Sequence, residues 1–209
     1  MQIIMRRASL VAVLAVLVGA CSPGGNKGPE TTVPTAPTTV ATTAPVDPFA
    51  VPTVIDAAYV DRVLAALNKV EGDLVRDLVE TNALTVEAST RLRAIYNDPK
   101  YQQEFDSLVK LFGAGTTEFK RPPGDRSTTV IELVSTSPAC ILAKTASDYS
   151  AVVTVPPAPE ADKVDIVTLR ATQPGADPKN LNPTPWSVSN DETINVSDSP
   201  PPRATCDAS

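Results

Sequence analysis

The chain has 209 residues, a formal charge of −6 and no histidine. Without histidine the chain cannot build a Ser-His-Asp or Cys-His nucleophile system, an H-E-x-x-H zinc site or a His-ligated haem. The acidic balance and the lack of any lysine and arginine cluster argue against nucleic acid as a partner, because binding requires neutralised phosphates. We expect no metal and no cofactor, and acid–base chemistry would have to rest on Asp, Glu, Tyr or Lys.

Residues 1–20 have the parts of a signal peptide. A basic start with Arg6 and Arg7 leads into an apolar run over 8–20. This run is too short to cross a membrane, since a spanning helix needs about 20 apolar residues. It ends in Leu17-Val18-Gly19-Ala20-Cys21, a pattern that resembles a bacterial lipobox.

The lipobox resemblance implies cleavage before Cys21 and a diacylglyceryl group on its sulfur. More than one acyl chain is needed for stable anchoring, and this group supplies two. The mature protein would then sit on the extracytoplasmic face of the cell membrane. Two alternatives are an ordinary secretory signal with an incidental cysteine and an uncleaved anchor. The anchor is the weaker, because the apolar run stops at residues 21–25.

Residues 21–55 form a linker rich in threonine and proline. The linker has almost no large apolar side chains and so cannot bury enough surface to fold. Proline keeps such a chain extended, so it reaches up to roughly 100 Å. An O-glycosylated stalk is compatible with this composition, but we favour a disordered, solvated spacer.

Three helices are predicted next, from apolar residues in steps of three and four. Asp56 is the expected N-cap of the first, and Asp98-Pro99 opens the third. Gly113 and Gly115 end the third helix, and a glycine pair in that place is typical of a C-cap instead of a phosphate loop. The predicted helices span 56–82, 86–96 and 98–113.

The pattern changes to alternation after Gly115 and predicts four strands. Prolines over 156–159 break the chain between the second and third strands, and a long loop covers 174–185. Helices first and strands afterwards indicate an α+β fold, with the helices on one face of an antiparallel sheet. The predicted strands span 128–135, 140–145 with an extension towards 155, 163–172 and 186–188.

This order of elements resembles the NTF2-like (SnoaL-like) cone fold over a domain of residues 56–198. The features that carry the resemblance are the three N-terminal helices and the segments Cys140–Val152, Val164–Ala171 and Pro183–Val188. The chain departs from many members by having no clear strand between its second and third helices. The resemblance implies a curved, mostly antiparallel sheet with a pocket between the sheet and the helices.

Four residues are candidates for that implied pocket. Asp148 and Asp165 are its possible acids, Tyr149 a nearby donor, and Trp186 a ring on which a ligand stacks. Each also has a structural interpretation, to which we give more weight. Asp148 and Tyr149 fit a strand-end turn with the ring in the core, Asp165 fits a solvent-facing strand position, and Trp186 fits packing that closes one end of the sheet.

Cys140 and Cys206 remain once Cys21 is lipidated. An even pair in an exported chain is expected to be oxidised, so we predict a Cys140–Cys206 disulfide. The bond would pin the proline-rich tail, residues 199–209, to the domain.

Two functions remain open from the sequence. The first is a non-catalytic lipoprotein module that binds an envelope protein or a small apolar ligand. The alternative is a histidine-free cone-fold enzyme with isomerase- or cyclase-like proton transfer on a small apolar substrate. A filled or purely apolar interior favours the first function. A deep pocket with a buried carboxylate and a tyrosine favours the second.

Overall fold

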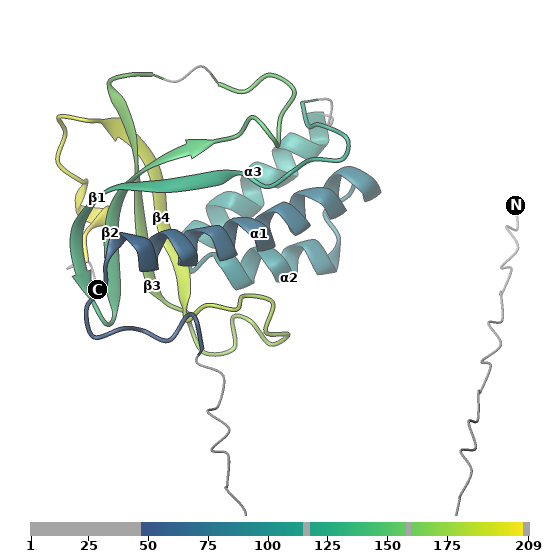
Figure 1. The fold of residues 1–209 in the computed structure, drawn as a ribbon. Helices are drawn as coiled ribbons and strands as arrows, with labels where there is room; N and C mark the ends of the chain where they lie inside the picture. Colours follow the sequence, from purple (N-terminus) through teal and green to yellow (C-terminus); the bar gives the residue numbers. More distant parts are fainter. Residues whose placement is uncertain (1–46, 115–117, 158–159, 207–209) are drawn as a thin grey trace, which may run out of the picture. The chain divides into compact units, whose positions relative to one another are not determined.

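The computed structural model describes residues 47–114, 118–157 and 160–206. They belong to one compact unit, Ala44–Ser209, in which three helices precede four strands (Figure 1). The signal peptide, Cys21 and the linker as far as residue 46 lie outside the described residues. No helix within the described part is both long and apolar enough to cross a membrane.

The three predicted helices form close to their predicted limits. Asp56 caps the first, as predicted, because its carboxylate accepts a hydrogen bond from the Tyr59 backbone N–H at 2.8 Å. Asn82 ends this helix in the left-handed conformation, with a φ of 52°. The third helix begins one residue after Pro99 and continues through Gly113. The helices are α1 (Ala57–Thr81), α2 (Val86–Ile95) and α3 (Lys100–Ala114).

The four strands form one open sheet in the order β1-β2-β3-β4, and each neighbouring pair is antiparallel. The predicted α+β class is therefore confirmed at this level. The last strand is longer than the predicted 186–188, because its polar second half also pairs with the third strand as far as Lys163 opposite Asn195. The strands are β1 (Ser127–Ser137), β2 (Cys140–Asp148), β3 (Lys163–Ala171) and β4 (Trp186–Asn195).

Both edges of the sheet are partly covered. At the β4 edge, Tyr96 forms an isolated parallel bridge with Val188, in the stretch between α2 and α3 where no strand was predicted. At the β1 edge, Asp61 of α1 accepts the backbone N–H of Val130 at 2.8 Å. Two register shifts in β1 add irregularity to the same edge. Such features discourage pairing with another chain.

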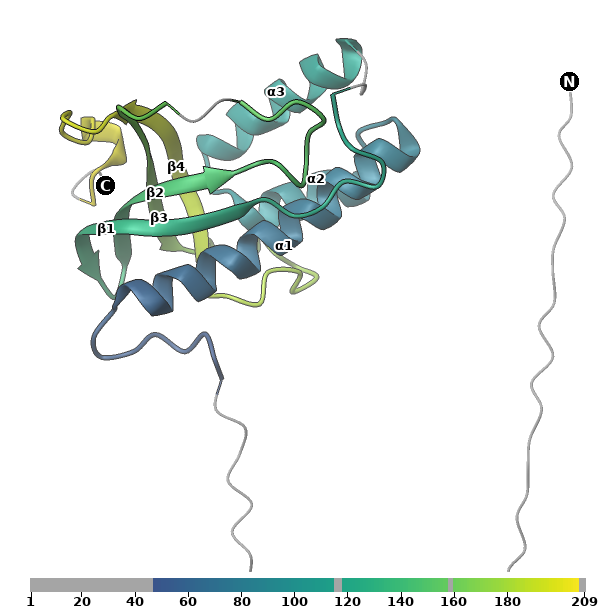
Figure 2. The same cartoon turned by 45° about the horizontal axis from the view of Figure 1, so that its top comes forward.

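The main core lies between the helices and one face of the sheet. In both views α1 runs alongside β1 (Figures 1 and 2), and its buried residues recur in the predicted steps of three and four. Phe49 and Ile55 also pack against this core, so packing begins before the predicted boundary at Asp56. The buried sheet residues of the core are Ile141, Val167, Leu169, Trp186 and Val188.

The C-terminal segment covers part of the other face. Ala204, in the short 3-10 helix η1 (Pro202–Ala204), is fully buried against Leu142 and Ile166. Its carbonyl accepts a hydrogen bond from the Thr168 hydroxyl at 2.6 Å. The sulfur atoms of Cys140 and Cys206 lie at disulfide distance, 2.14 Å, with Cα atoms 5.7 Å apart. The predicted pairing therefore matches the structure, and the described part of the tail packs with the domain.

Candidate functional site

The interior between helices and sheet is mainly apolar at the end where β3 and β4 pair through Ala171 and Trp186, and the buried Asn182 and Thr184 side chains donate to the Trp186 carbonyl there. Trp186 is only 1 % exposed, and its Nε1–H donates to the Tyr59 hydroxyl at 2.8 Å. An indole that is enclosed and satisfied in this way has no face left for a ligand. Trp186 therefore has the packing role that we gave more weight from the sequence, and it lines none of the hollows described below.

Towards the other end of the sheet, the interior is built around Arg126. This side chain is 11 % exposed and lies just before β1. Its Nε lies 2.9 Å from Glu71 Oε2 of α1 and donates to Asn68 Oδ1 at 2.9 Å. Its Nη1 donates to the Tyr149 hydroxyl at 3.1 Å and to Asp191 Oδ2 of β4 at 3.4 Å. We call these five residues the Arg126 cluster.

Two further groups extend the Arg126 cluster towards the helices. The Tyr96 hydroxyl donates to Glu71 Oε1 at 3.2 Å. Lys100 Nζ donates to the Asp191 carbonyl at 2.9 Å and pairs with Glu104 at 2.7 Å. The cluster thus ties α1, the start of α3, the approach to β1 and the strand β4 together through charged groups.

Burial changes the titration of the Arg126 cluster. Burial raises the pKa of Glu71 and of Asp191, although the nearby Arg126 charge opposes both changes. Glu71 keeps 22 % of its side chain accessible, but its Oε2 is fully buried, and that atom is the one beside Arg126. Burial also raises the pKa of Tyr96 and Tyr149.

Arg126 itself remains charged. Burial alone would lower the pKa of its guanidinium, but the negative charge of Glu71 and the other acidic groups around it hold that pKa well above its usual value. One permanent cation therefore lies beside two buried carboxylates and offsets part of their negative charge.

A hollow of about 420 Å³ opens beside the Arg126 cluster, and Tyr149 belongs to both. Thr145, Asp165 and Thr193 are cross-strand neighbours on β2, β3 and β4, so they form a row across the hollow's wall. The Thr193 hydroxyl donates to Asp165 Oδ1 at 2.8 Å. We call this space the β2–β3 hollow. Its lining is Thr145, Ala146, Ser147, Asp148, Tyr149, Pro156, Pro157, Glu160, Lys163, Val164, Asp165 and Thr193.

The lining of the β2–β3 hollow contains one buried polar atom without a partner. Thr145 is 0 % exposed, and its Oγ1 makes no hydrogen bond to any described residue.

Asp148, in contrast, is exposed and accepts hydrogen bonds from the Ser150 N–H at 2.8 Å and hydroxyl at 3.0 Å. These bonds lower the pKa of Asp148 and form the strand-end turn that was one of our two interpretations.

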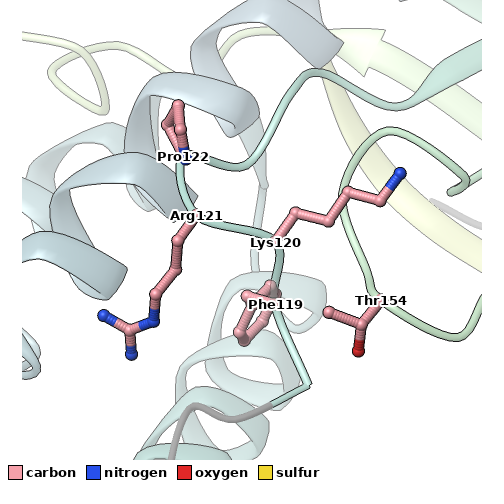
Figure 3. Close-up of a pocket in the computed structure, with 5 residues that line it drawn as sticks. All are labelled: Phe119, Lys120, Arg121, Pro122 and Thr154. Carbon is pink, nitrogen blue, oxygen red and sulfur yellow. The ribbon is translucent and has the colours of Figure 1, made fainter.

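A larger hollow, about 600 Å³, lies on the loop after α3 and offers less chemistry (Figure 3). It is lined by Phe119, Lys120, Arg121, Pro122 and Thr154. Figure 3 shows that Lys120 and Arg121 point away from each other, so their charges do not converge on one ligand. The β2–β3 hollow is the better candidate despite its smaller volume, because it holds a buried unpartnered group and adjoins the Arg126 cluster.

The structure brings together three of the four residues that the sequence singled out. Asp148, Tyr149 and Asp165 all line the β2–β3 hollow, whereas Trp186 lies at the opposite end of the sheet. Sequence reasoning missed Arg126 with its buried carboxylates, and it missed Thr145. No local pattern in the sequence singles out Thr145, which follows Lys144 in the strand that starts at Cys140.

Within the described ranges, no group of three or more Cys, Asp or Glu side chains is arranged to hold a metal ion. Comparisons of the chain with protein-family models, with curated proteins and with solved structures find no match.

Proposed function

We propose that this protein is a lipid-anchored binding module of a bacterial cell envelope. Cys21 would carry the lipid on the extracytoplasmic face of the membrane, the threonine- and proline-rich linker would act as a spacer, and the β2–β3 hollow would be the binding site. The observation that carries the proposal is the contrast between the two groups of side chains that meet at Tyr149. The buried charges are paired with one another, while the neighbouring hollow is open and has an unpartnered hydroxyl.

A non-catalytic role is supported by the position of the buried acids. A general acid or base must come within hydrogen-bond reach of the atom on which it acts. Glu71 and Asp191 are held by Arg126, and neither lines the β2–β3 hollow. Of the five residues in the Arg126 cluster, Tyr149 alone reaches that lining.

One observation favours the alternative, a histidine-free enzyme. Two carboxylates and a tyrosine with raised pKa values lie beside a hollow, and such groups gather at active sites. Under this alternative Tyr149 would transfer the proton, because it is the group of the Arg126 cluster that lines the hollow. A Tyr149→Phe variant that still binds ligand but no longer converts it would establish the enzyme.

We also propose that the domain is of the NTF2-like type. Three N-terminal helices followed by an antiparallel sheet, with the helices against one face, support this assignment. An experimental structure tests it, since a sheet that curls around the helices is required and a flat sheet would contradict the assignment.

The anchor is tested by detergent-phase partitioning. We expect the wild-type chain to enter the detergent phase and a Cys21→Ala variant to stay in the aqueous phase, because only the sulfur of Cys21 would be acylated. A double variant, Cys140→Ala with Cys206→Ala, is the matched control and should partition like the wild type. Equal partitioning of wild type and Cys21→Ala into water would remove the lipoprotein assignment.

The binding role is tested on the mature chain with Cys21→Ser, labelled for NMR and mixed with a low-molecular-weight fraction of bacterial envelope. We expect the amide signals of Ser147, Tyr149 and Asp165 to shift, and the bound compound to be recovered with its mass unchanged. Recovery of a chemically altered compound would favour the enzyme. If signals elsewhere move while these three stay fixed, the hollow is not the site.

A further inference from the structure

The lining of the β2–β3 hollow is acidic. Its charged residues are three acids, Asp148, Glu160 and Asp165, and one cation, Lys163. Glu160 and Lys163 are exposed, whereas Asp165 is half-buried in the row across the strands. A concave wall with an excess of one sign of charge concentrates ligands of the opposite sign.

The unpartnered Thr145 hydroxyl gives this acidic hollow a specific contact. A buried polar atom without a partner is costly, so native proteins satisfy such atoms with protein, water or ligand. Thr145 pairs across the strands with Asp165, whose Oδ1 already accepts a hydrogen bond from Thr193. A ligand N–H placed over this row can donate to Thr145 Oγ1 while its positive charge lies beside the Asp165 carboxylate.

One of the interior carboxylates, Asp191, lies close enough to Asp165 to interact with it. Asp165 is one of the charges that raise the pKa of Asp191, so the two carboxylates sense each other, while Arg126 and Lys100 act in the opposite direction. A cation in the hollow would interact favourably with Asp165 directly, while the attraction of Asp191 behind it is opposed by the charges of Arg126 and Lys100.

We infer that the β2–β3 hollow binds an organic cation that carries N–H donors, a primary ammonium or a guanidinium group. Thr145 and Asp165 supply the directed contacts, and Asp148 and Glu160 supply the surrounding charge. The volume of about 420 Å³ suits a small molecule or the end of a larger one. The inference rests on the proposed binding function and narrows it to one class of ligand.

Calorimetric titration of the mature Cys21→Ser chain with agmatine tests the inference, with glucose and acetate as neutral and anionic comparisons. We expect agmatine to bind and the other two to fail. Asp165→Asn should weaken agmatine binding by about tenfold, because it removes a charge-assisted hydrogen bond. Thr145→Val, which keeps the side-chain shape, should weaken binding by about fivefold through loss of the acceptor.

Two exposed substitutions serve as controls that leave the fold intact. Lys163→Gln should strengthen agmatine binding by about threefold, because it removes the one cation of the lining. Asp106→Asn makes the same charge change as Asp165→Asn on α3, outside the hollow, and should leave the affinity unchanged.

The inference is wrong if glucose binds as well as agmatine, or if Asp165→Asn and Asp106→Asn have the same effect. It is also wrong if agmatine fails to bind while an envelope fraction still shifts the Ser147 and Tyr149 signals. That last result would leave the binding function standing with a different ligand. If neither agmatine nor any envelope fraction acts on the hollow, the inference and the proposed binding site fall together.

Discussion

The two ends of the helix–sheet interior are built by different physical means. Around Trp186, large side chains fill the space, and the indole N–H donates to the Tyr59 hydroxyl. Around Arg126, the same layers are joined by ion pairs between charged side chains, and a hollow opens beside them. The difference indicates that the apolar end stabilises the fold by packing, while the polar end fixes Tyr149 at the wall of the β2–β3 hollow.

Trp186→Ala would disrupt the packing at the apolar end, and we expect it to cause the largest loss of stability. The free energy of unfolding should fall by about 3–5 kcal/mol, the usual cost of removing a buried aromatic side chain. Urea unfolding measures this loss. Tyr59→Phe removes the hydroxyl that accepts from the indole and donates to the Phe49 carbonyl, and it should cost less, about 1–3 kcal/mol. Equal losses for the two variants would mean that the hydrogen bond, and not the packing, holds this end.

Arg126→Met would disrupt the polar end, because it leaves Glu71 and Asp191 buried without the cation that pairs with them. We expect a loss of about 3–5 kcal/mol at neutral pH, the cost of an uncompensated buried pair. Adding Glu71→Gln and Asp191→Asn to the variant should restore much of the loss, because the buried charges are then gone.

The pH dependence sharpens the same test. The pKa values of Glu71 and Asp191 are raised in the folded state, so the protonated carboxyl groups favour folding. This contribution to stability is complete when the pH is below the pKa values of the unfolded chain. It is lost as the pH rises through the pKa values of the folded protein. Acidification should therefore reduce the deficit of Arg126→Met relative to wild type. Urea unfolding at several pH values measures this. If the stability lost in Arg126→Met becomes larger in acid, the unpaired carboxylates are not the cause of the loss.

Reduction of the Cys140–Cys206 pair tests the opposite face of the sheet, behind the apolar end. We expect the free energy of unfolding to fall by ~2–4 kcal/mol, since the bond restricts the unfolded chain. Hydrogen exchange should show the amides of Ala204 and Thr205 opening first, with Leu64 of α1 still protected. Simultaneous opening of α1 would mean that the C-terminal segment is an integral part of the main core.

The helices and the first three strands follow from local patterns, and their predicted limits lie close to the observed ones. The second half of β4 escaped prediction because its polar residues, from Ser189 to Asn195, do not alternate in hydrophobicity, and only pairing with β3 makes them a strand. Phe49 was assigned to the linker for a similar reason. A single aromatic residue among prolines does not form the hydrophobic periodicity of a helix or strand, yet Phe49 packs against the core.

The sequence by itself determined the α+β class, the Asp56 cap, the packing alternative for Trp186 and the pairing of Cys140 with Cys206. Each of these depends on local periodicity, on local hydrogen bonding or on the small number of available partners. Only the tertiary structure decided that Tyr149 and Trp186 lie at opposite ends of the interior and that Arg126 lies between two carboxylates. The two partners in the Arg126–Asp191 contact are 65 residues apart in the chain, and no local pattern encodes a pairing of charges over such a separation.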